Sequence, residues 1–301
     1  MLANLSASIV IPSSGRPDVL ELTLDALCAQ EVAPSEFEVI VVDDGASPPI
    51  SGRLQPYVDR LALRSIRLER LGPGAARNAG AKLADSRLLI FLDDDCVPDP
   101  HWLNAYLRAY AKATDAALAG PILNGLPNDI SSEAYHLIFG YLYSRHVDGF
   151  ATSAPFVISA NFAVSAALFD SLGGFDERFR IAGEDRMFSE EWLRGGRTLL
   201  AAPDAIVRHH RPLTVRSFLA QQYRYGRGGM ILRKALRERG WFAKPLESSS
   251  FYANLLLTAF HHPKPGDRIP LFLLLVLSQA AIAAGHAVEL FRPGLPPRHI
   301  D

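Results

Sequence analysis

Short apolar runs alternate with amphipathic stretches over the first hundred residues of the chain. Four of these runs have the length of buried strands and stop at polar or turn-forming residues, at positions 8–11, 37–42, 63–68 and 88–92. Two stretches with the helical spacing of apolar residues fall between them, at 17–30 and 73–84. Strands that alternate with helices predict an α/β fold with a largely parallel sheet.

The second half of the chain changes from this alternation to mostly helical patterns. Further helices are predicted at 100–112, 131–143 and 166–172, and further strands at 161–164 and 198–201. The remaining segments are helical, at 215–239, 251–261 and 269–290. We therefore predict an α/β domain over residues 1–214 and a C-terminal helical extension over residues 215–301.

The last of these helices contains an apolar run, LFLLLVLSQAAIAA, at residues 271–284. The run is shorter than the roughly 20 residues that a helix needs to span a bilayer. Its length favours a helix buried in the protein. The alternatives are peripheral membrane contact through residues 269–290 or contact with a partner, including a second copy in a homodimer.

Composition and charge narrow the class of protein. The chain has 31 basic and 32 acidic residues, a formal net charge of −1, so it lacks the basic footprint of a nucleic-acid binder. Its two cysteines, Cys28 and Cys96, are too few for a disulfide framework and suit a reducing compartment. The N-terminal sequence has no signal-peptide pattern. We expect a cytoplasmic protein, membrane-associated on the cytoplasmic face if the last helix meets lipid.

Three consecutive carboxylates, Asp93, Asp94 and Asp95, follow the apolar run at 88–92. Ligands bind beyond the carboxyl ends of strands in open α/β sheets, so Pro12, Asp44 and this triplet should gather at one edge. Adjacent carboxylates repel one another, and burying them favours a compensating cation. Oxygen ligands suit Mg²⁺ or Mn²⁺. The alternative is an N-cap cluster for the helix that begins near residue 100.

Four further positions have a functional and a structural interpretation each. Asp44 precedes a glycine and is by itself typical of a turn. Arg77 lies in GPGAARNAG, where small residues allow either a phosphate contact or tight packing of a helix with Arg77 on the surface. Asp185 begins a helix, which favours its anion and suits a general base or a simple cap. Of His209 and His210, only one can face a given site from an extended segment.

These segments, taken in order, resemble the family 2 glycosyltransferases of the GT-A fold. The resemblance covers about residues 6–230 and rests on the ordered set SIVIPSSGRP, EVIVVDDGA, GAARNAG, LLIFLDDDCVP, GGFDE, GEDRMFSEEWLRGG and VRHHR. It implies a Rossmann-like mixed sheet flanked by helices. It also implies a metal-dependent enzyme that transfers sugar from a nucleotide-sugar donor, usually UDP-linked, to an acceptor hydroxyl with inversion.

The resemblance assigns a role to most of the candidate residues. Pro12 would line the nucleotide pocket, Asp44 would hydrogen-bond the base, and Arg77 would contact the nucleotide. Asp93 would reach the ribose or diphosphate, and Asp94 belongs to the same nucleotide-sugar group without a role of its own.

The remaining assignments concern the metal and the reaction. Asp95 would coordinate the divalent cation, Mn²⁺ or Mg²⁺, with His209 as the second protein ligand. Asp185 would be the general base, and Asn161 and Glu184 would lie near the donor sugar or the acceptor.

The sequence departs from the family pattern in places, and these departures refine the prediction. Residues 13–16 replace a common aromatic and Asn, so they receive no role. Trp192 lies too close to the Glu-Asp pair to form the motif of processive synthases, which favours a non-processive enzyme. The acceptor is a carbohydrate, a lipid-linked or a small molecule, and no motif identifies it.

Two rival functions remain as alternatives. A non-catalytic nucleotide-sugar-binding module would use the same pocket without turnover. A nucleotidyltransferase would normally carry a glycine- and Arg/Lys-rich loop after the first strand, which PSSGRP matches poorly.

Overall fold

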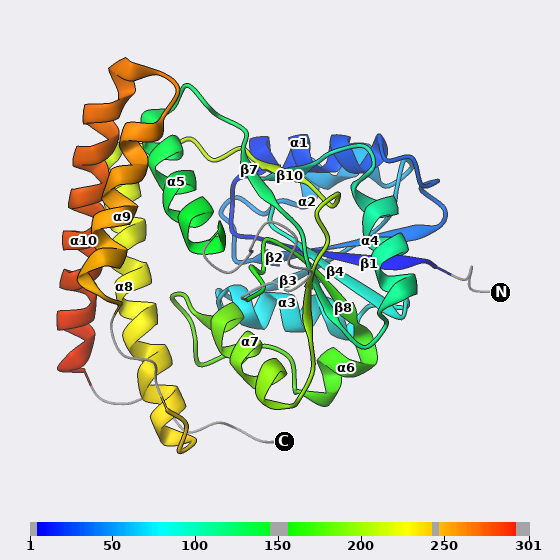
Figure 1. The fold of residues 1–301 in the computed structure, drawn as a ribbon. Coiled ribbons are helices and arrows are strands. Elements are labelled where there is room, and N and C mark those ends of the chain that lie inside the picture. Colours follow the sequence, from blue (N-terminus) through cyan, green and yellow to red (C-terminus); the bar gives the residue numbers. More distant parts are fainter. Residues whose placement is uncertain (1–4, 145–155, 243–246, 293–301) are drawn as a thin grey trace. The chain divides into compact units, whose positions relative to one another are not determined.

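The computed structural model describes residues 5–144, 156–242 and 247–292 of the 301-residue chain (Figure 1). Contacts divide the chain into two units, which we describe separately. The first comprises residues 1–125, 149–180 and 184–210, and the second residues 126–148, 181–183 and 211–301. Residues 126–148 thus group with the C-terminal helices, and the predicted domain boundary at residue 214 stays a prediction.

A seven-stranded sheet forms the centre of the first unit. In spatial order its strands are β3 (Ala62–Leu68), β2 (Phe37–Asp44), β1 (Ala7–Ser13), β4 (Leu88–Leu92), β8 (Asn161–Ser165), β6 (Ala117–Ala119) and β9 (Leu199–Ala201). Only β8 runs antiparallel to its neighbours, β4 and β6. Strands β2 and β3 follow β1 on one side, and β4 then pairs with the opposite edge of β1. The sheet therefore has a topological switch point between β1 and β4.

Helices cover both faces of this sheet and bury its apolar side chains. On one face lie α1 (Pro17–Cys28), the single-turn α2 (Ser51–Leu54) with the 3₁₀ turn η1 (Gln55–Tyr57), and α4 (Trp102–Lys112). On the other lie α3 (Pro73–Lys82), α6 (Ala166–Ser171) and α7 (Glu184–Arg194). Trp102 and Trp192 are fully buried, one on each face. The mixed α/β architecture predicted from the sequence is confirmed.

A second, three-stranded sheet was not predicted. Its strands are β5 (Cys96–Pro98), β10 (Val207–His209) and β7 (Ile122–Asn124). The central strand, β10, pairs antiparallel with β5 and parallel with β7. Each strand has only three residues, too few to show a periodic pattern in the sequence.

The second unit is helical. It contains α5 (Ile130–Ser144), α8 (Val215–Glu238), α9 (Ser249–Leu257) with the 3₁₀ turns η2 (Thr258–His261) and η3 (Pro265–Asp267), and α10 (Arg268–Leu290). Helices α8 and α10 approach closely at two glycines. A Cβ added to Gly226 would lie 2.1 Å from the Ile282 carbonyl oxygen, and one added to Gly285 would lie 2.2 Å from that of Tyr223.

The structure corrects the prediction for the apolar run at 271–284. Helix α10 has 23 residues and is longer than the run itself. Within the described residues, Pro265–Leu290 is the one helical segment long and apolar enough to cross a membrane; its apolar 18-residue stretch has a mean hydropathy of 2.0, and only 28% of that stretch is buried. The helix at 269–290 was predicted, but the expectation that it is buried was wrong, because the length of a charge-free run does not show how many of its sides the protein covers.

Candidate functional site

The ends of β1 and β4 bring polar side chains together at the switch point. Ser13, the last residue of β1, donates a hydrogen bond from its Oγ to Asp94 Oδ2 at 2.7 Å. The backbone turns immediately after β4, where the Cys96 amide donates to the Asp93 carbonyl oxygen at 3.1 Å. The Thr23 hydroxyl of α1 donates to the carbonyl oxygen of Asp94 at 3.0 Å. The predicted convergence of these strand ends is confirmed for β1 and β4.

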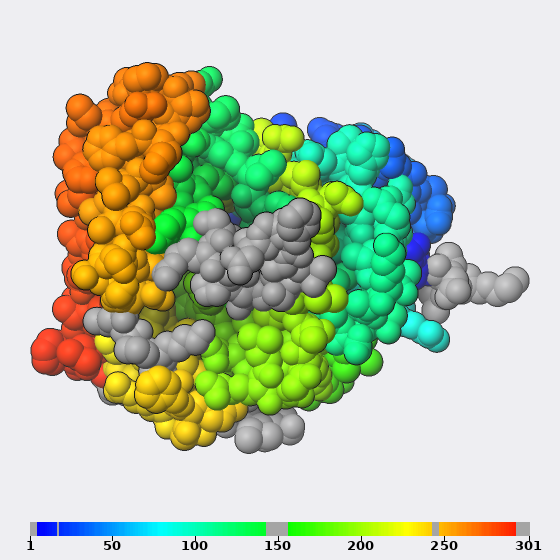
Figure 2. Space-filling view, in the orientation of Figure 1, coloured from blue at the N-terminus to red at the C-terminus, as the bar shows by residue number. Residues whose placement is uncertain are grey.

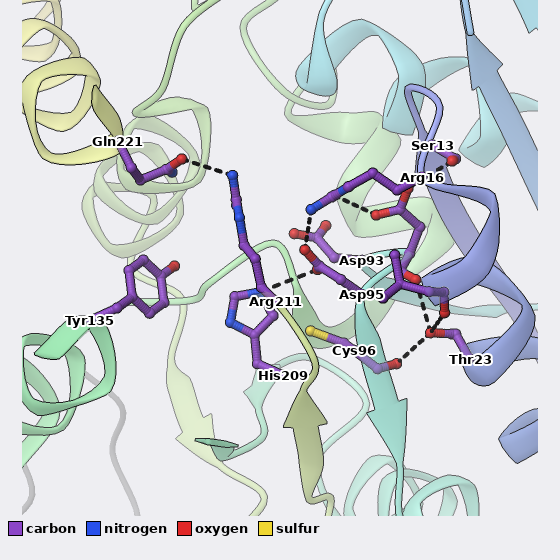
Figure 3. A network of polar contacts seen from close by, with 12 residues as sticks. Ser13, Arg16, Thr23, Asp93, Asp95, Cys96, Tyr135, His209, Arg211 and Gln221 are labelled. Carbon is purple, nitrogen blue, oxygen red and sulfur yellow. Dashed lines mark hydrogen bonds and ion pairs between the residues drawn. The ribbon is translucent and has the colours of Figure 1, made fainter. Parts of the chain in front are cut away.

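The small sheet brings His209 to this cluster (Figure 3). In the pairing of β10 with β5, His209 lies opposite Cys96, next to Asp95. His209 Nε2 is 3.2 Å from Asp95 Oδ1, and both side chains are buried. The His210 amide donates to the Asp95 carbonyl oxygen at 2.7 Å, while the ring of His210 lies against Gly125. As the alternation of an extended segment predicts, one histidine faces the carboxylates and the other does not.

Asp95 and His209 have the chemistry of a divalent-cation site. Ligand atoms of Asp95, Cys96 and His209 all lie within 4.8 Å of one another. Carboxylate oxygen and imidazole nitrogen both suit Mn²⁺, whereas thiolate sulfur suits softer metals. Burial and the three neighbouring aspartates also raise the pKa of Cys96 well above its usual value. Asp95 and His209 are therefore candidate ligands of a divalent cation, with the Cys96 thiol beside them.

Arg16 compensates the carboxylates in the structure, a contact that the sequence did not predict. Its guanidinium bonds both Asp94 and Asp95, and its side chain is 38% exposed. Burial raises the pKa of Asp94 to about 7, against the opposing effect of Arg16. The Arg in SSGRP was the available signal, but nothing in the sequence shows that the turn after β1 directs it back to β4.

Arg77 links this cluster to a second pair of acids. It donates to Asp93 and, at 3.1 Å, to Glu184 Oε1. The side chain is buried, so the alternative of a surface charge was wrong. Burial alone would lower the pKa of Arg77, but Asp93 and Glu184 outweigh it and the pKa is raised. The guanidinium is therefore a buried cation between the carboxyl groups of Asp93 and Glu184.

The small residues of α3 explain how Arg77 reaches this position. Gly72 begins the helix with a φ of 99°, which favours glycine. A Cβ added to Gly80 would lie 2.4 Å from Val10 Cγ1, so α3 packs directly on β1. The tight packing of this helix is confirmed, with Arg77 buried and ion-paired, and the predicted contact of Arg77 with a nucleotide stays a prediction.

Glu184 and Asp185 form the first turn of α7. Burial raises the pKa of Glu184 to about 7, with a further contribution from the neighbouring Asp185. Burial also raises the pKa of Asp185, against the opposing effect of Arg186. The sequence predicted that the helix N-terminus would favour the anion of Asp185. Burial outweighs that effect here, which makes Asp185 a stronger proton acceptor once it is ionised.

The two candidate nucleotide residues on β1 and β2 lie at strand ends. Pro12 is past the last β1–β4 pair and is paired only with Val42 of β2, so the sheet tolerates its missing amide hydrogen. Asp44 accepts the backbone amides of Leu71 at 2.7 Å and Gly72 at 2.9 Å. It thereby fixes the loop that leads into α3. The predicted place of Pro12 in a nucleotide pocket and the predicted hydrogen bond of Asp44 to a base stay predictions.

Asn161 is fully buried, and both the oxygen and the nitrogen of its side-chain amide form hydrogen bonds. Its Oδ1 accepts Trp102 Nε1 and the Tyr106 hydroxyl, each at 2.9 Å. Its Nδ2 donates to the carbonyl oxygens of Pro121 at 3.0 Å and Ala205 at 2.8 Å. These bonds tie β8 to α4 and to two loops. The predicted contact of Asn161 with a sugar stays a prediction, and we leave it out of the site proposed below.

Known proteins share both the sequence pattern and the fold. Residues 8–173 match the family described as glycosyl transferase family 2. The chain is 40% identical over 106 residues to a validoxylamine A glucosyltransferase of Streptomyces hygroscopicus subsp. limoneus, a stretch that is 35% of this chain and 23% of that protein. It is 26% identical over 225 residues to the glycosyltransferase AglE of Haloferax volcanii, covering 73% and 72% of the two chains. The chain thus spans about a quarter of the validoxylamine A glucosyltransferase.

Two solved glycosyltransferase structures have the same fold. The mannosyltransferase PcManGT from Pyrobaculum calidifontis, solved with GDP-Man and Mn²⁺, superimposes with a TM-score of 0.61 at 18% identity, covering 96% of this chain and 81% of that one. TarS 1–349 of S. aureus, solved with UDP, gives a TM-score of 0.52 at 18% identity, covering 94% and 90%. These matches assign the first unit to the GT-A type. The chain belongs to glycosyl transferase family 2.

Proposed function

We propose that the chain transfers a sugar from a nucleoside diphosphate sugar to an acceptor hydroxyl, with inversion and with a divalent cation. The observation that carries the proposal is that two sets of paired charged groups meet in the Asp93–Asp95 run after β4. Asp95 pairs with His209, and Asp93 pairs with Arg77, which also pairs with Glu184 at the start of α7. The family match supports sugar transfer, and the PcManGT structure with GDP-Man and Mn²⁺ supports a metal-dependent site on this fold.

We assign the cation to Asp95 and His209 and the general base to Asp185. The cation, when bound, supplies positive charge that stabilises the departing diphosphate. Asp185 accepts the proton of the acceptor hydroxyl as that oxygen bonds the anomeric carbon. The bond from this carbon to the diphosphate oxygen breaks in the same displacement. With no protein nucleophile in the step, the configuration at the anomeric carbon inverts.

The other residues hold these groups in position. Arg77 keeps Asp93 and Glu184 at fixed positions, and the Asp44 carboxylate holds the loop before α3. Pro12, Asp44, Arg77, Asp93 and Asp94 line the proposed nucleotide side. The hydrogen bonds and ion pairs of this frame limit the reorganisation that the site needs during the reaction.

We further propose UDP as the carrier, a non-processive mode and a cytoplasmic site of action. The TarS complexes with UDP and UDP-GlcNAc support the first, although the PcManGT complex contains GDP-Man. The free thiols of Cys28 and Cys96 support a reducing compartment.

A donor panel tests the proposal directly. Hydrolysis of UDP- and GDP-sugars in water needs no known acceptor, and NMR of the fresh product reports its anomeric configuration. We expect turnover of a UDP-sugar with Mn²⁺ and the inverted anomer as the first product. Retention would overturn the single displacement. Turnover of GDP-sugars alone would overturn the UDP assignment, and donor binding without any turnover would favour a non-catalytic binding module.

A further inference from the structure

Helix α10 exposes apolar residues along its whole length. All of its strongly exposed side chains are apolar: Ile269, Pro270, Leu273, Val276, Leu277, Ala280, Ala283, Ala284, Ala287, Val288 and Leu290. Phe291, directly after the helix, is 87% exposed. Spacings of three and four residues place most of these on one face. Figure 2 shows part of the orange-to-red surface to which they belong.

The polar residues of α10 lie on its other side. Ser278 and Glu289 are buried, and Gln279 and His286 are only partly exposed. Glu289 forms an ion pair with Arg227 of α8 at 2.8 Å. Lys234 of α8 donates to the carbonyl oxygens of Glu289 and Arg292 at the end of the helix. Polar groups facing inward and apolar groups facing outward reverse the arrangement of a soluble surface helix.

We infer that the exposed face of α10 lies in the plane of an anionic membrane surface, with its apolar side chains in the acyl boundary. Charge supports this partner, because α8 packs along α10 and carries six basic residues against one acidic residue. Such helices attract anionic headgroups. The flanks of the apolar face carry a net positive charge, with Lys264, Asp267 and Arg268 before it and Arg292 after it.

The same basic helix argues against a spanning arrangement. From Ile269 to Phe291 the face extends about 33 Å, close to the thickness of the hydrocarbon core. Arg227 and Lys234 are held against the last turns of α10, so α10 cannot cross the bilayer without drawing cations of α8 in with it. Charged side chains at the bilayer centre are strongly disfavoured. The face therefore lies along the surface.

The composition of the face favours lipid over a second copy of the chain. Protein interfaces draw much of their binding energy from Trp, Tyr and Arg anchors at their centre, surrounded by a polar rim. From residue 269 to residue 290 the exposed side chains are aliphatic, and the aromatic Phe291 lies at the end of the face. A fluid acyl layer accommodates such a smooth surface without anchors.

Vesicle flotation of the full chain tests the inference. We expect the protein to float with vesicles of phosphatidylcholine containing about 30% phosphatidylglycerol, and less with phosphatidylcholine alone. The double variant Leu273→Glu/Leu277→Glu should reduce the bound fraction at least tenfold. The matched control, Leu22→Glu/Val58→Glu, adds the same charges at similarly exposed apolar positions of the first unit and should float like the wild type. Circular dichroism verifies that both variants are folded.

Tryptophan depth measurements distinguish the arrangements. Single variants Ile269→Trp, Leu277→Trp and Val288→Trp should be quenched to similar, shallow depths by brominated lipids. If the tryptophan at position 277 is quenched at a much greater depth than those at positions 269 and 288, the helix spans the bilayer and the in-plane arrangement is overturned. A wild type that stays in solution with both lipid mixtures would overturn membrane binding. If it also elutes as a dimer that Leu273→Glu/Leu277→Glu dissociates, the face binds a second copy. None of these outcomes depends on the proposed sugar transfer.

Discussion

Soluble proteins usually expose charged side chains and bury large apolar ones. The carboxylate cluster after β4 and the outer face of α10 are opposite exceptions: the first buries charge, and the second exposes apolar side chains. Asp94 and Asp95 are charged groups with almost no exposure, whereas Ile269 and Leu273 are large apolar groups that are more than half exposed. Each arrangement is unfavourable in water. Each is therefore informative, because a buried charge or an exposed apolar stripe persists only where something else stabilises it.

The comparison also shows what kind of partner each region requires. The acids are held by point charges and directed hydrogen bonds from Arg16, Ser13 and Arg77, so their partner must be small, charged and precisely placed. The face of α10 offers no hydrogen-bonding side chain among its exposed residues, so its partner must be apolar and need not be ordered. A cation with a diphosphate fits the first description, and an acyl layer fits the second.

Removing the proposed base should have the largest effect. We expect Asp185→Asn to lower turnover by about 10²–10⁴-fold while leaving donor affinity nearly unchanged, because a general base acts on the acceptor proton in the transition state. Steady-state kinetics and calorimetric donor binding measure the two quantities. Glu190→Gln, on the outer part of the same helix, is the control and should keep wild-type turnover. An Asp185→Asn enzyme with near-full activity would contradict the assignment.

Loss of a proposed metal ligand should be the next largest effect. Asp95→Asn should weaken Mn²⁺ binding by at least about 10–100-fold, the loss known even for residues that only support a ligand. Electron paramagnetic resonance of free Mn²⁺ measures this without any turnover. The control is Asp99→Asn, which changes a nearby, partly exposed carboxylate that is paired with Arg208. Equal Mn²⁺ affinity in wild type and Asp95→Asn would place the cation elsewhere.

Replacing Arg16 with a neutral residue tests whether the buried acids need a positive charge beside them. Arg16→Met should lower the stability of the metal-free protein by about 1–3 kcal/mol, since two buried carboxylates lose a partly exposed partner. Added Mn²⁺ should restore more stability to this variant than to the wild type. Thermal unfolding with EDTA or Mn²⁺ measures the loss of stability and its restoration. The control is Arg53→Met, which removes an exposed ion pair elsewhere in the first unit. An unchanged melting temperature in EDTA would show that Arg16 does not compensate the acids.

The smallest effect is a change in the pH dependence of stability. The pKa of Glu184 is raised to about 7, so the folded state holds a proton that the unfolded state releases near pH 4.5. Unfolding free energy should therefore fall as pH rises from about 4.5 to 7, by on the order of 1–3 kcal/mol. Glu184→Gln should flatten this part of the profile, measured by denaturant unfolding in EDTA, whereas Glu190→Gln should not. A steeper fall in the Glu184→Gln variant would contradict the sign.

The sequence predicted those parts of the molecule that depend on long periodic patterns. The strand at 88–92 was placed with its exact bounds, and the main helices within a few residues, because each has enough positions to show its period. The three-residue strands β5, β6 and β7 were missed for the opposite reason, whereas β9 was predicted at 198–201 and the residues of β10 only as an extended segment. His209 was nevertheless predicted to face the acids, through the family resemblance and not through its strand.

Side-chain contacts between residues far apart in the sequence were harder to predict from the sequence. Arg16 and Asp95 are 79 positions apart and meet only because α1 directs the turn after β1 back to β4. Arg77 was expected to contact a nucleotide, and its ion pair with Glu184 requires α3 and α7 to pack on the same face of the sheet. The orientation of α10 was likewise hidden, because an apolar run does not show which of its sides meets the rest of the protein.

Metal dependence of turnover is the most direct test of the central claim, that the carboxylates after β4 hold a cation for sugar transfer. The measurement is UDP-sugar hydrolysis by the wild type after treatment with EDTA, followed by titration with Mn²⁺. We predict that EDTA abolishes turnover and that Mn²⁺ restores it, with little restoration in Asp95→Asn. Full turnover by the EDTA-treated, metal-free protein would contradict the account.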